Sequence, residues 1–410
     1  MTSINWSTNI LTTDLRRLLM NFWAKIRQSL FIEQNVFVLS ITVLFVLIAF
    51  FVWYPVLPIY LQELGANDFQ VGFSYTLLAL SYTLMQFLGG ILSDHFGRKL
   101  LIIIPSFVFP FLYFLAGNSS NWIILIFFLI IANSLSALQL PSFYSMIAES
   151  VPKYKRGIAF SRFELFVILG ITIGPAVGMV LIPRLEIKYL FYLTSLTTFF
   201  CALARTFWLK ETHHYRTKIK KFDSFKKLFN KKMLLIILAL SSLFLLFNLA
   251  THGPFISLYA NEVMNLDKSK INLLFALGGL AAVIYSLWGG KIIDKWGSKK
   301  VLLLSSAGLG TFLILWSLSS PLWPAITLFA ILYIFSQSCH IAYDSFLADI
   351  THQESRGLVI GFIGTCTGLI GSLGPSLGGY LKSQIGPSSP FWAGLIFALA
   401  TSLLLTKLKD

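Results

Sequence analysis

Apolar residues run through the chain in long, nearly unbroken stretches that short polar segments separate. A helix of about 20 apolar residues crosses the hydrocarbon core of a bilayer, and in lipid it satisfies its own backbone hydrogen bonds. The stretches lack the alternation of apolar and polar positions that a membrane β-barrel requires. The pattern therefore predicts an all-α polytopic membrane protein with twelve transmembrane helices, over residues 37–60, 70–92, 99–116, 121–149, 157–182, 189–209, 233–260, 271–290, 299–318, 322–349, 357–381 and 390–406.

Composition and charge placement support this prediction and orient the chain. Of its residues 56% are hydrophobic and only 12% are charged, which excludes an ordinary soluble domain. The net charge of +15 would suit a nucleic-acid partner in a soluble protein, but 25 of the 32 Lys and Arg residues lie in the N-terminal tail, the even-numbered loops and the C-terminal tail. The positive-inside rule then places both termini in the cytoplasm, and we expect an integral protein of a prokaryotic plasma (inner) membrane without a nucleic-acid partner. The opposite loops carry five: Arg184, Lys188, Lys268, Lys270 and Lys382.

The first 36 residues precede the first span and lack a cleavable signal peptide. Leucines, Phe22 and Ile26 recur at helical spacing within residues 13–30. Residues 1–36 are therefore expected to be a cytoplasmic tail that either carries an amphipathic helix on the inner leaflet or is disordered. The three cysteines fall inside the spans, so no disulfide framework is implied.

The sequence repeats itself at an interval of 200 residues. "GILSD" ending at Asp94 matches "GKIID" ending at Asp294, and "AESVPKYKRG" (148–157) matches "ADITHQESRG" (348–357). "GITIGPAVG" (170–178) matches "IGSLGPSLGG" (370–379) in the same register. An even number of helices in each copy makes the copies parallel. The organisation predicted is a six-helix bundle over 37–209, a basic cytoplasmic linker over 210–232, a second six-helix bundle over 233–406 and a tail over 407–410.

"GILSDHFGRK" (90–99) resembles the loop 2–3 signature of the major facilitator superfamily at nearly every position, and the twelve spans and the repeat extend the resemblance over essentially the whole chain. The resemblance implies the two-bundle fold of that superfamily and secondary transport by alternating access. It also implies that an acidic residue in this loop latches the cytoplasmic side shut against helix 11 of the other bundle. Here Asp94 would face the helix that starts near Gly357, and a carboxylate there suits the positive end of a helix dipole.

Around Asp94, the glycine at 97 supplies a tight reversal, and Arg98 is expected to join Glu149, with Arg156 as a further candidate. In the second copy Ser298 replaces Arg98, so we expect a weaker latch there. The alternative is that the basic residues are only topology signals. The full set of latch candidates is Asp94, Gly97, Arg98, Glu149, Arg156, Asp294, Asp349 and Arg356.

Small residues form a stripe on the fifth predicted helix, since Gly170, Gly174 and Gly178 follow one another at four-residue intervals. Pro175 within this stripe removes a backbone hydrogen bond and favours a bend. The pattern resembles the helix 5 signature of drug/proton antiporters, with Met179 in place of the last glycine. The alternative is ordinary close packing, because helix 11 repeats the pattern with Gly374 and Pro375.

Ionisable residues inside predicted spans are costly and are hypotheses of function by default. Asp344 and His340 share a face of helix 10, whereas Arg162 and Glu164 on helix 5 are two positions apart and point to different faces. Asp344 is the best candidate for a proton site, and its depth matches that of Arg162 in the other bundle. We predict that the two pair when the cytoplasmic side is closed; the alternative is that Asp344 forms a structural salt bridge elsewhere or faces water with His340.

Two features of drug antiporters are absent. The fourth helix, "FFLIIANSLSALQLP", has no arginine, and the first helix, "FFVWYPVLP", has no acid, so proton coupling would need other groups. An aromatic, weakly charged cavity suits hydrophobic or amphiphilic organic molecules. Its candidate lining residues are Trp53, Tyr54, Gln86, Asn133, Gln139, Tyr144, Asn248 and Tyr343.

These observations together favour a membrane-embedded secondary transporter, expected to be a monomer, that exports hydrophobic or amphiphilic compounds of the multidrug type in exchange for protons. No nucleotide-binding loop and no convergent catalytic or metal-ligating set stands in the sequence, so we expect no enzyme, no cofactor and no metal site. Two alternatives remain: a symporter or facilitator that imports a small organic nutrient or metabolite, and a membrane sensor that transports nothing.

Overall fold

The computed structural model describes residues 33–212, 231–319, 322–351 and 356–408. Within these ranges it has twelve helices that are long and apolar enough to cross a membrane, which confirms the predicted fold class. The predicted amphipathic helix at 13–30 and most of the predicted linker lie outside the described residues. The helical elements are α2 (Gln34–Phe51), η1 (Tyr54–Val56), α3 (Leu57–Glu63), α4 (Asp68–Phe96), α5 (Arg98–Gly117), α6 (Trp122–Ser150), η2 (Lys153–Lys155), α7 (Arg156–Leu181), α8 (Ile187–Trp208), α9 (Lys231–Leu249), α10 (Phe255–Glu262), α11 (Lys268–Trp296), α12 (Ser298–Ser317), α13 (Leu322–Ile350), α14 (Arg356–Gly371), α15 (Gly374–Gln384) and α16 (Ser389–Thr406).

Local sequence fixes where several helices begin. The side chain of Asn67 accepts a hydrogen bond from the backbone of Gln70, whose own side chain bonds back, which forms a capping box at the start of α4. Asp267 caps α11 through the backbone N–H of Lys270. These caps satisfy N–H groups that a helix would otherwise leave unpaired at its first turn.

Three spans are interrupted where the sequence predicted continuous helices. The first breaks between α2 and η1 ahead of Pro55, and the seventh breaks between α9 and α10 ahead of Pro254. The eleventh breaks between α14 and α15 ahead of Pro375, because a proline cannot donate to the preceding turn and its ring clashes with it. The equivalent Pro175 does not break α7, which runs through it to Leu181.

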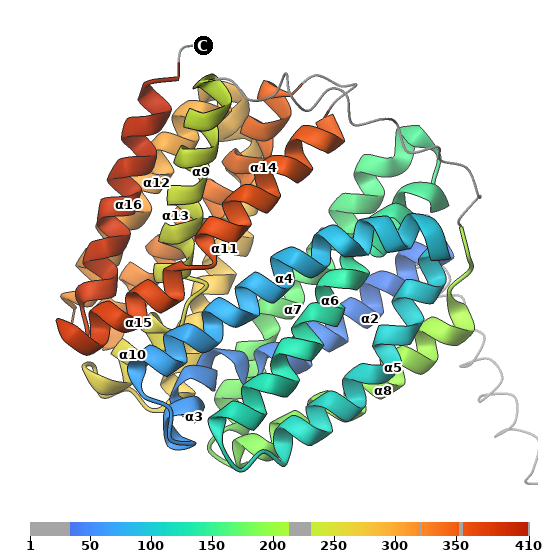
Figure 1. The fold of residues 1–410 in the computed structure, drawn as a ribbon, viewed down its shortest axis with the longest axis horizontal. Coiled ribbons are helices and arrows are strands. Elements are labelled where there is room, and N and C mark those ends of the chain that lie inside the picture. Colours follow the sequence, from blue (N-terminus) through green and yellow to red (C-terminus); the bar gives the residue numbers. More distant parts are fainter. Residues whose placement is uncertain (1–32, 213–230, 320–321, 352–355, 409–410) are drawn as a thin grey trace, which may run out of the picture.

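The spans from α2 to α8 pack on one another, and those from α9 to α16 do the same; we call these groups the N bundle and the C bundle. Aromatic side chains fill both interiors. Trp53 packs against Phe191 in the N bundle, and Trp316 packs against Phe391 in the C bundle. Figure 1 shows the two groups of helices inclined toward each other.

We name the two ends of the molecule by their loops. The odd-loop face carries the ends of α3, α10 and α15, and the linker face carries the ends of α4, α8 and α9. The bundles meet toward the odd-loop face, where α15 packs on α4, α11 on α7 and α10 on α3, and their ribbons stand apart at the linker face (Figure 1). Small residues allow this approach: a Cβ on Gly72 would lie 2.3 Å from the carbonyl oxygen of Pro375.

Candidate functional site

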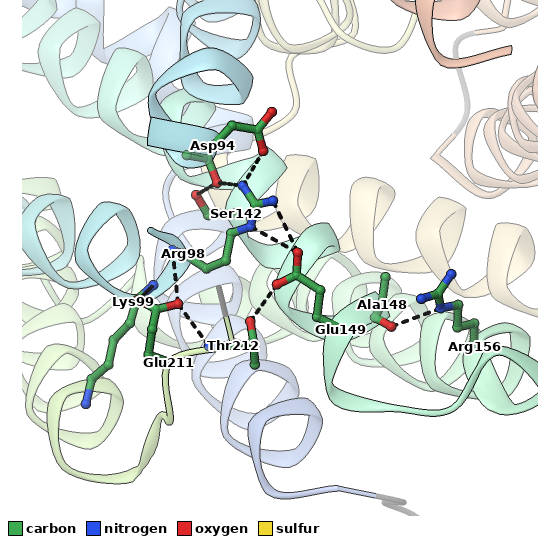
Figure 2. Close-up of polar contacts among 10 residues, drawn as sticks. Asp94, Arg98, Lys99, Ser142, Ala148, Glu149, Arg156, Glu211 and Thr212 are labelled. Atoms are coloured by element: carbon green, nitrogen blue, oxygen red, sulfur yellow. Dashed lines mark hydrogen bonds and ion pairs between the residues drawn. The ribbon is translucent and has the colours of Figure 1, made fainter. Parts of the chain in front are cut away.

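The turn between α4 and α5 gathers the charged residues that the sequence singled out. Gly97 alone separates the two helices, and its φ of +93° is a conformation that other residues adopt only with strain. The guanidinium of Arg98 donates to Asp94 at 2.6 Å and to Glu149 at 3.2 Å (Figure 2). The structure therefore brings one carboxylate from α4 and one from α6 onto a single arginine.

The hydroxyl of Ser93 helps to hold Arg98 in place. Its Nη1 also donates to Ser93 Oγ at 2.8 Å, and the hydroxyl of Ser142 lies 2.9 Å from that of Ser93 (Figure 2). The Arg98 side chain is 9% exposed, whereas that of Asp94 is 59% exposed. The arginine is thus a fixed, buried cation, and Asp94 is the member of the cluster that remains open to solvent.

The chain just after α8 docks on the same turn, which the sequence did not predict. The carboxylate of Glu211 accepts hydrogen bonds from the backbone N–H groups of Arg98, at 3.2 Å, and Lys99, at 3.0 Å. Thr212 Oγ1 donates to Glu149 at 2.7 Å (Figure 2). An anion at this helix N-terminus satisfies two otherwise unpaired donors and complements the helix dipole. The sequence shows the acidic residue in "WLKET", but no pattern in it connects this residue to the turn.

Arg156 does not join the ion cluster. Its Nε donates to the carbonyl oxygen of Ala148 at 2.9 Å, so it caps the last turn of α6 instead (Figure 2). Among the described contacts, Arg156 therefore serves the end of α6 and not the carboxylate of Glu149, which corrects the expectation that it is a member of the Arg98–Glu149 group.

The second copy of the motif keeps the turn and both acids but not the arginine. Gly297 adopts a φ of +83°, as Gly97 does. Ser298 Oγ donates to Asp349 at 2.5 Å, so a hydroxyl–carboxylate bond stands where the N bundle has an arginine between two acids. Asp294 lies in the last turn of α11. Arg356 is the first residue of α14, and its side chain lies outside the described part of the structure.

The described residues show no contact of Asp94 with the other bundle in this conformation. Among the described residues, the hydrogen bond recorded for its carboxylate is the one from Arg98. This agrees with the separation of the bundles at the linker face in Figure 1, because a latch on that face would close only when the bundles approach there. The latch stays a prediction.

A second cluster lies between the bundles, around Asp344. The hydroxyl of Tyr144 on α6 donates to Glu164 on α7 at 2.8 Å, and the Glu164 carboxylate interacts electrostatically with Asp344 on α13. Asp344 interacts in turn with Tyr144 and with its own neighbour Tyr343. Each bundle thus contributes one carboxylate and one tyrosine to this cluster.

Other predicted members of this site lie elsewhere. No ion pair joins Asp344 to Arg162 among the described residues in this conformation, so their pairing on closure stays a prediction. His340 stacks on Phe247 with ring centroids 4.3 Å apart and on His252 at 5.3 Å, which places it in the packing of the C bundle.

Two of the cavity candidates do not line the space between the bundles. Trp53 is 1% exposed and donates through Nε1 to Thr194. Gln139 is 2% exposed and donates to Ser106 and to the backbone of Ile102. Both are corrected to core residues of the N bundle, where a buried polar group needs a partner within its own bundle.

The remaining candidates are less buried. Tyr54 stacks on Phe50, with ring centroids 4.9 Å apart, and lies beside Tyr75. The side-chain amides of two others donate to backbone carbonyls, one on a neighbouring helix and one in the preceding turn, and Gln86 is exposed on the linker half of α4. These amides belong to Asn133, which donates to Leu78, and Asn248, which donates to Phe244.

The glycine stripe of α7 packs mainly inside the N bundle. A Cβ on Gly170 or Gly174 would collide with α2, at Leu47 and Phe51 respectively. Gly178 also approaches the other bundle, because its Cβ would lie 2.9 Å from Oδ1 of Asn272 on α11. In the second copy Gly374 and Pro375 follow the break in the helix, and Gly374 faces Asn248 and Leu245 of α9. The stripe therefore serves helix packing, and only its Gly178 end lies between the bundles.

Comparison with known proteins agrees with this architecture. A family model described as "Major Facilitator Superfamily" matches residues 39–251 and again residues 238–410. The chain is 26% identical to the multi-drug resistance efflux pump PmrA homolog of Lactococcus lactis over 86% of this chain and 89% of that protein. It is 21% identical to the quinolone resistance protein NorA of Staphylococcus aureus over 92% of this chain and 99% of that protein.

Among solved structures, the nucleoside transporter NupG superposes with a TM-score of 0.74 at 15% identity, over 92% of this chain and 98% of that one. That likeness concerns the fold, which is the two-bundle arrangement of α2 to α16. The two matches of the family model cover both copies of the repeat, the first with the turn at Gly97 and the second with the turn at Gly297. The protein belongs to the major facilitator superfamily and is an integral membrane transporter.

Proposed function

We propose that this transporter exports hydrophobic or amphiphilic organic compounds, cations among them, in exchange for protons by alternating access. The observation that carries the proposal is the cluster of Asp344 with Glu164 and Tyr144, one carboxylate from each bundle. Two carboxylates that interact electrostatically inside a membrane protein repel each other, and either a proton or an organic cation relieves that repulsion. Competition between the two for one site is the simplest basis for exchange.

The orientation follows from the charge distribution. With the linker face in the cytoplasm, as the positive-inside rule requires, the bundle contacts lie on the outer side and the protein is open toward the cytoplasm. An exporter loads its cargo in this conformation. On closure of the cytoplasmic side, Asp344 would exchange its interaction with Glu164 for a pair with Arg162, and Asp94 would reach α14.

The names of the relatives support export as the direction of transport and drug-like compounds as the class of substrate. The pumps of Lactococcus lactis and Streptococcus pneumoniae are named for multi-drug resistance, and each matches over more than 80% of both chains. The tyrosines around Asp344 add an aromatic surface, which favours flat or amphiphilic cations through cation–π contact.

The test is transport of ethidium in proteoliposomes under an imposed pH gradient. The wild type is expected to move the dye against the direction of proton flow, and Asp344→Asn is expected to lose the dependence on the gradient while it still binds neutral substrates. Asp267→Asn is the matched control, because asparagine also caps a helix well. Partial burial raises the pKa of Asp267, but its hydrogen bonds from Lys270 outweigh this and hold the pKa below its ordinary value, so the control residue stays ionised.

Other outcomes would assign another function. Uptake of a small nutrient together with protons would indicate a symporter, and the absence of any solute movement in active vesicles would favour a sensor. Asp344→Asn with an unchanged response to the pH gradient would remove Asp344 from proton coupling. If the charge-exchanged variant, Asp344→Arg with Arg162→Asp, does not recover transport, the proposed pairing of Asp344 with Arg162 is contradicted, and the rest of the proposal is unaffected.

A further inference from the structure

Lys382 on α15 lies at the centre of a polar network that joins the two bundles on the odd-loop face. Its ammonium contacts the carboxylate of Asp68 on α4 at 2.5 Å and that of Glu262 on α10 at 2.8 Å. Gln62 on α3 donates to the same two carboxylates, at 2.9 Å each. Four elements, two from each bundle, thus meet on one lysine that the sequence showed only as a stray basic residue among the odd loops.

The cation of the network is buried, and its two acids are partly exposed. The Lys382 side chain is 3% exposed, and the side chains of its two acids are 27% and 30% exposed. One turn deeper, a Cβ on Gly379 would lie 2.8 Å from the backbone oxygen of Asp68, and Ser376 bonds to Thr76 across the same contact. The helices α4 and α15 are therefore in backbone contact, and this close packing excludes water from the ammonium group of Lys382.

Helix ends make Lys382 more important than its charge alone suggests. Asp68 is the first residue of α4, where the helix dipole favours an anion, and Lys382 lies in the last turn of α15, where it favours a cation. Glu262 is the last residue of α10, where the dipole disfavours its carboxylate. Without Lys382, the carboxylate of Glu262 would face that of Asp68 across the bundle boundary, with only the side chain of Gln62 between them.

A second ion pair crosses the boundary beside it. Lys268 on α11 contacts Glu63 at the end of α3 at 2.6 Å, but the Lys268 side chain is 25% exposed and that of Glu63 is 49% exposed. Exposed pairs of this kind contribute little, whereas loss of one member of a buried pair is strongly destabilising. The buried network is the stronger of the two.

We propose that Lys382 is the positioning residue that sets the equilibrium between the conformations closed and open on the odd-loop face. Its ammonium neutralises one carboxylate of each bundle only when the bundles are in contact. Separation of the bundles breaks the Lys382–Asp68 ion pair and the Gln62–Glu262 hydrogen bond, which both cross the boundary, and leaves the contacts Lys382–Glu262 and Gln62–Asp68 within their own bundles. The role rests on the alternating-access cycle proposed above, but it depends neither on the substrate nor on protons.

The experiment measures the distance across the odd-loop face in detergent or nanodiscs without substrate. Spin labels at Ser120 and Leu318 lie in equivalent loops of the two bundles, both exposed and away from the network, on a background in which the three cysteines are replaced. Lys382→Met is expected to raise the ratio of open to closed molecules at least tenfold, and Lys382→Arg is expected to keep it near the wild-type value. Lys270→Met is the matched control, because Lys270 pairs with Asp267 inside one bundle, and it should leave the ratio unchanged.

A third variant separates charge from packing. Lys382→Met combined with Asp68→Asn and Glu262→Gln removes the repulsion as well as the cation, so it is expected to return the population toward closed. Equal distance distributions for Lys382→Met, Lys270→Met and the wild type would overturn the proposal. A triple variant that is more open than Lys382→Met would overturn it too, since loss of packing would then explain the effect. Because no transport is measured, failure of the drug-export proposal would leave this result standing.

Discussion

Glu211→Ala tests whether the chain after α8 stabilises the start of α5. The carboxylate accepts two backbone hydrogen bonds, from Arg98 and Lys99, in the position of a helix cap. Loss of a side-chain cap costs about 1 kcal/mol, and Glu211 is solvent-exposed, so we expect no more than that. A local cost of about 1 kcal/mol corresponds to a roughly fivefold faster opening of the first turn of α5.

Hydrogen exchange measured on the peptide that contains Arg98 and Lys99 reports this opening directly. Glu211→Ala should raise its exchange about fivefold, and Glu211→Gln, which keeps an acceptor oxygen without the charge, should raise it less. The equivalent peptide with Ser298 and Lys299 lies in the other bundle and should not change. An unaltered exchange rate at Arg98 in the alanine variant, or an equal rise in both peptides, would refute the capping role.

Three further predictions use the same residues and labels. Asn272→Leu removes a fully buried Oδ1 that accepts no hydrogen bond from the described residues. The variant should therefore favour the conformation closed on the odd-loop face by about 1 kcal/mol, which corresponds to a roughly fivefold shift in the populations of the Ser120–Leu318 distance. An unchanged distance distribution would show that the unpaired oxygen does not destabilise the closed conformation. Cysteines at Ser120 and Tyr154 should react with an impermeant reagent from opposite sides of the membrane, and labelling from one side would contradict the twelve-span topology. Asp94→Asn should lower transport and favour the cytoplasm-open form at normal expression, whereas wild-type turnover would reduce the motif to a topology signal.

Hydropathy predicted the spans because burial in lipid selects long apolar runs whatever the neighbouring helices are. It did not predict the breaks in the first, seventh and eleventh helices. A proline is tolerated in a membrane helix when neighbouring groups satisfy the freed backbone, and this depends on tertiary contacts that the sequence does not display. Pro175 and Pro375 occupy equivalent positions, yet only the helix of Pro375 is broken.

The charged turn was predictable in its local part only. Asp94 and Arg98 are four residues apart at a helix end, so their contact follows from spacing, and Glu149 followed from the resemblance to the family. Glu211 reaches the turn from more than 100 residues away, and no periodicity reports such a contact. Trp53 and Gln139 were misplaced because a polar or amphipathic side chain within a span fits a cavity and a hydrogen-bonded core equally well.

The repeat itself explains why the odd-loop face can close. Gln62 and Glu262 are equivalent positions 200 residues apart, and they contact each other across the boundary at 2.9 Å. Two identical bundles related by a twofold axis would place the same residue at both positions, and two glutamates there would repel. Asp68 and Lys268 are likewise equivalent and have opposite charges, while Lys382 has Ile182 as its equivalent, so the buried cation comes from one bundle alone. The backbone repeat supplies the geometry of the contact, and divergence of the two copies at a few helix ends supplies the charge complementarity that holds it.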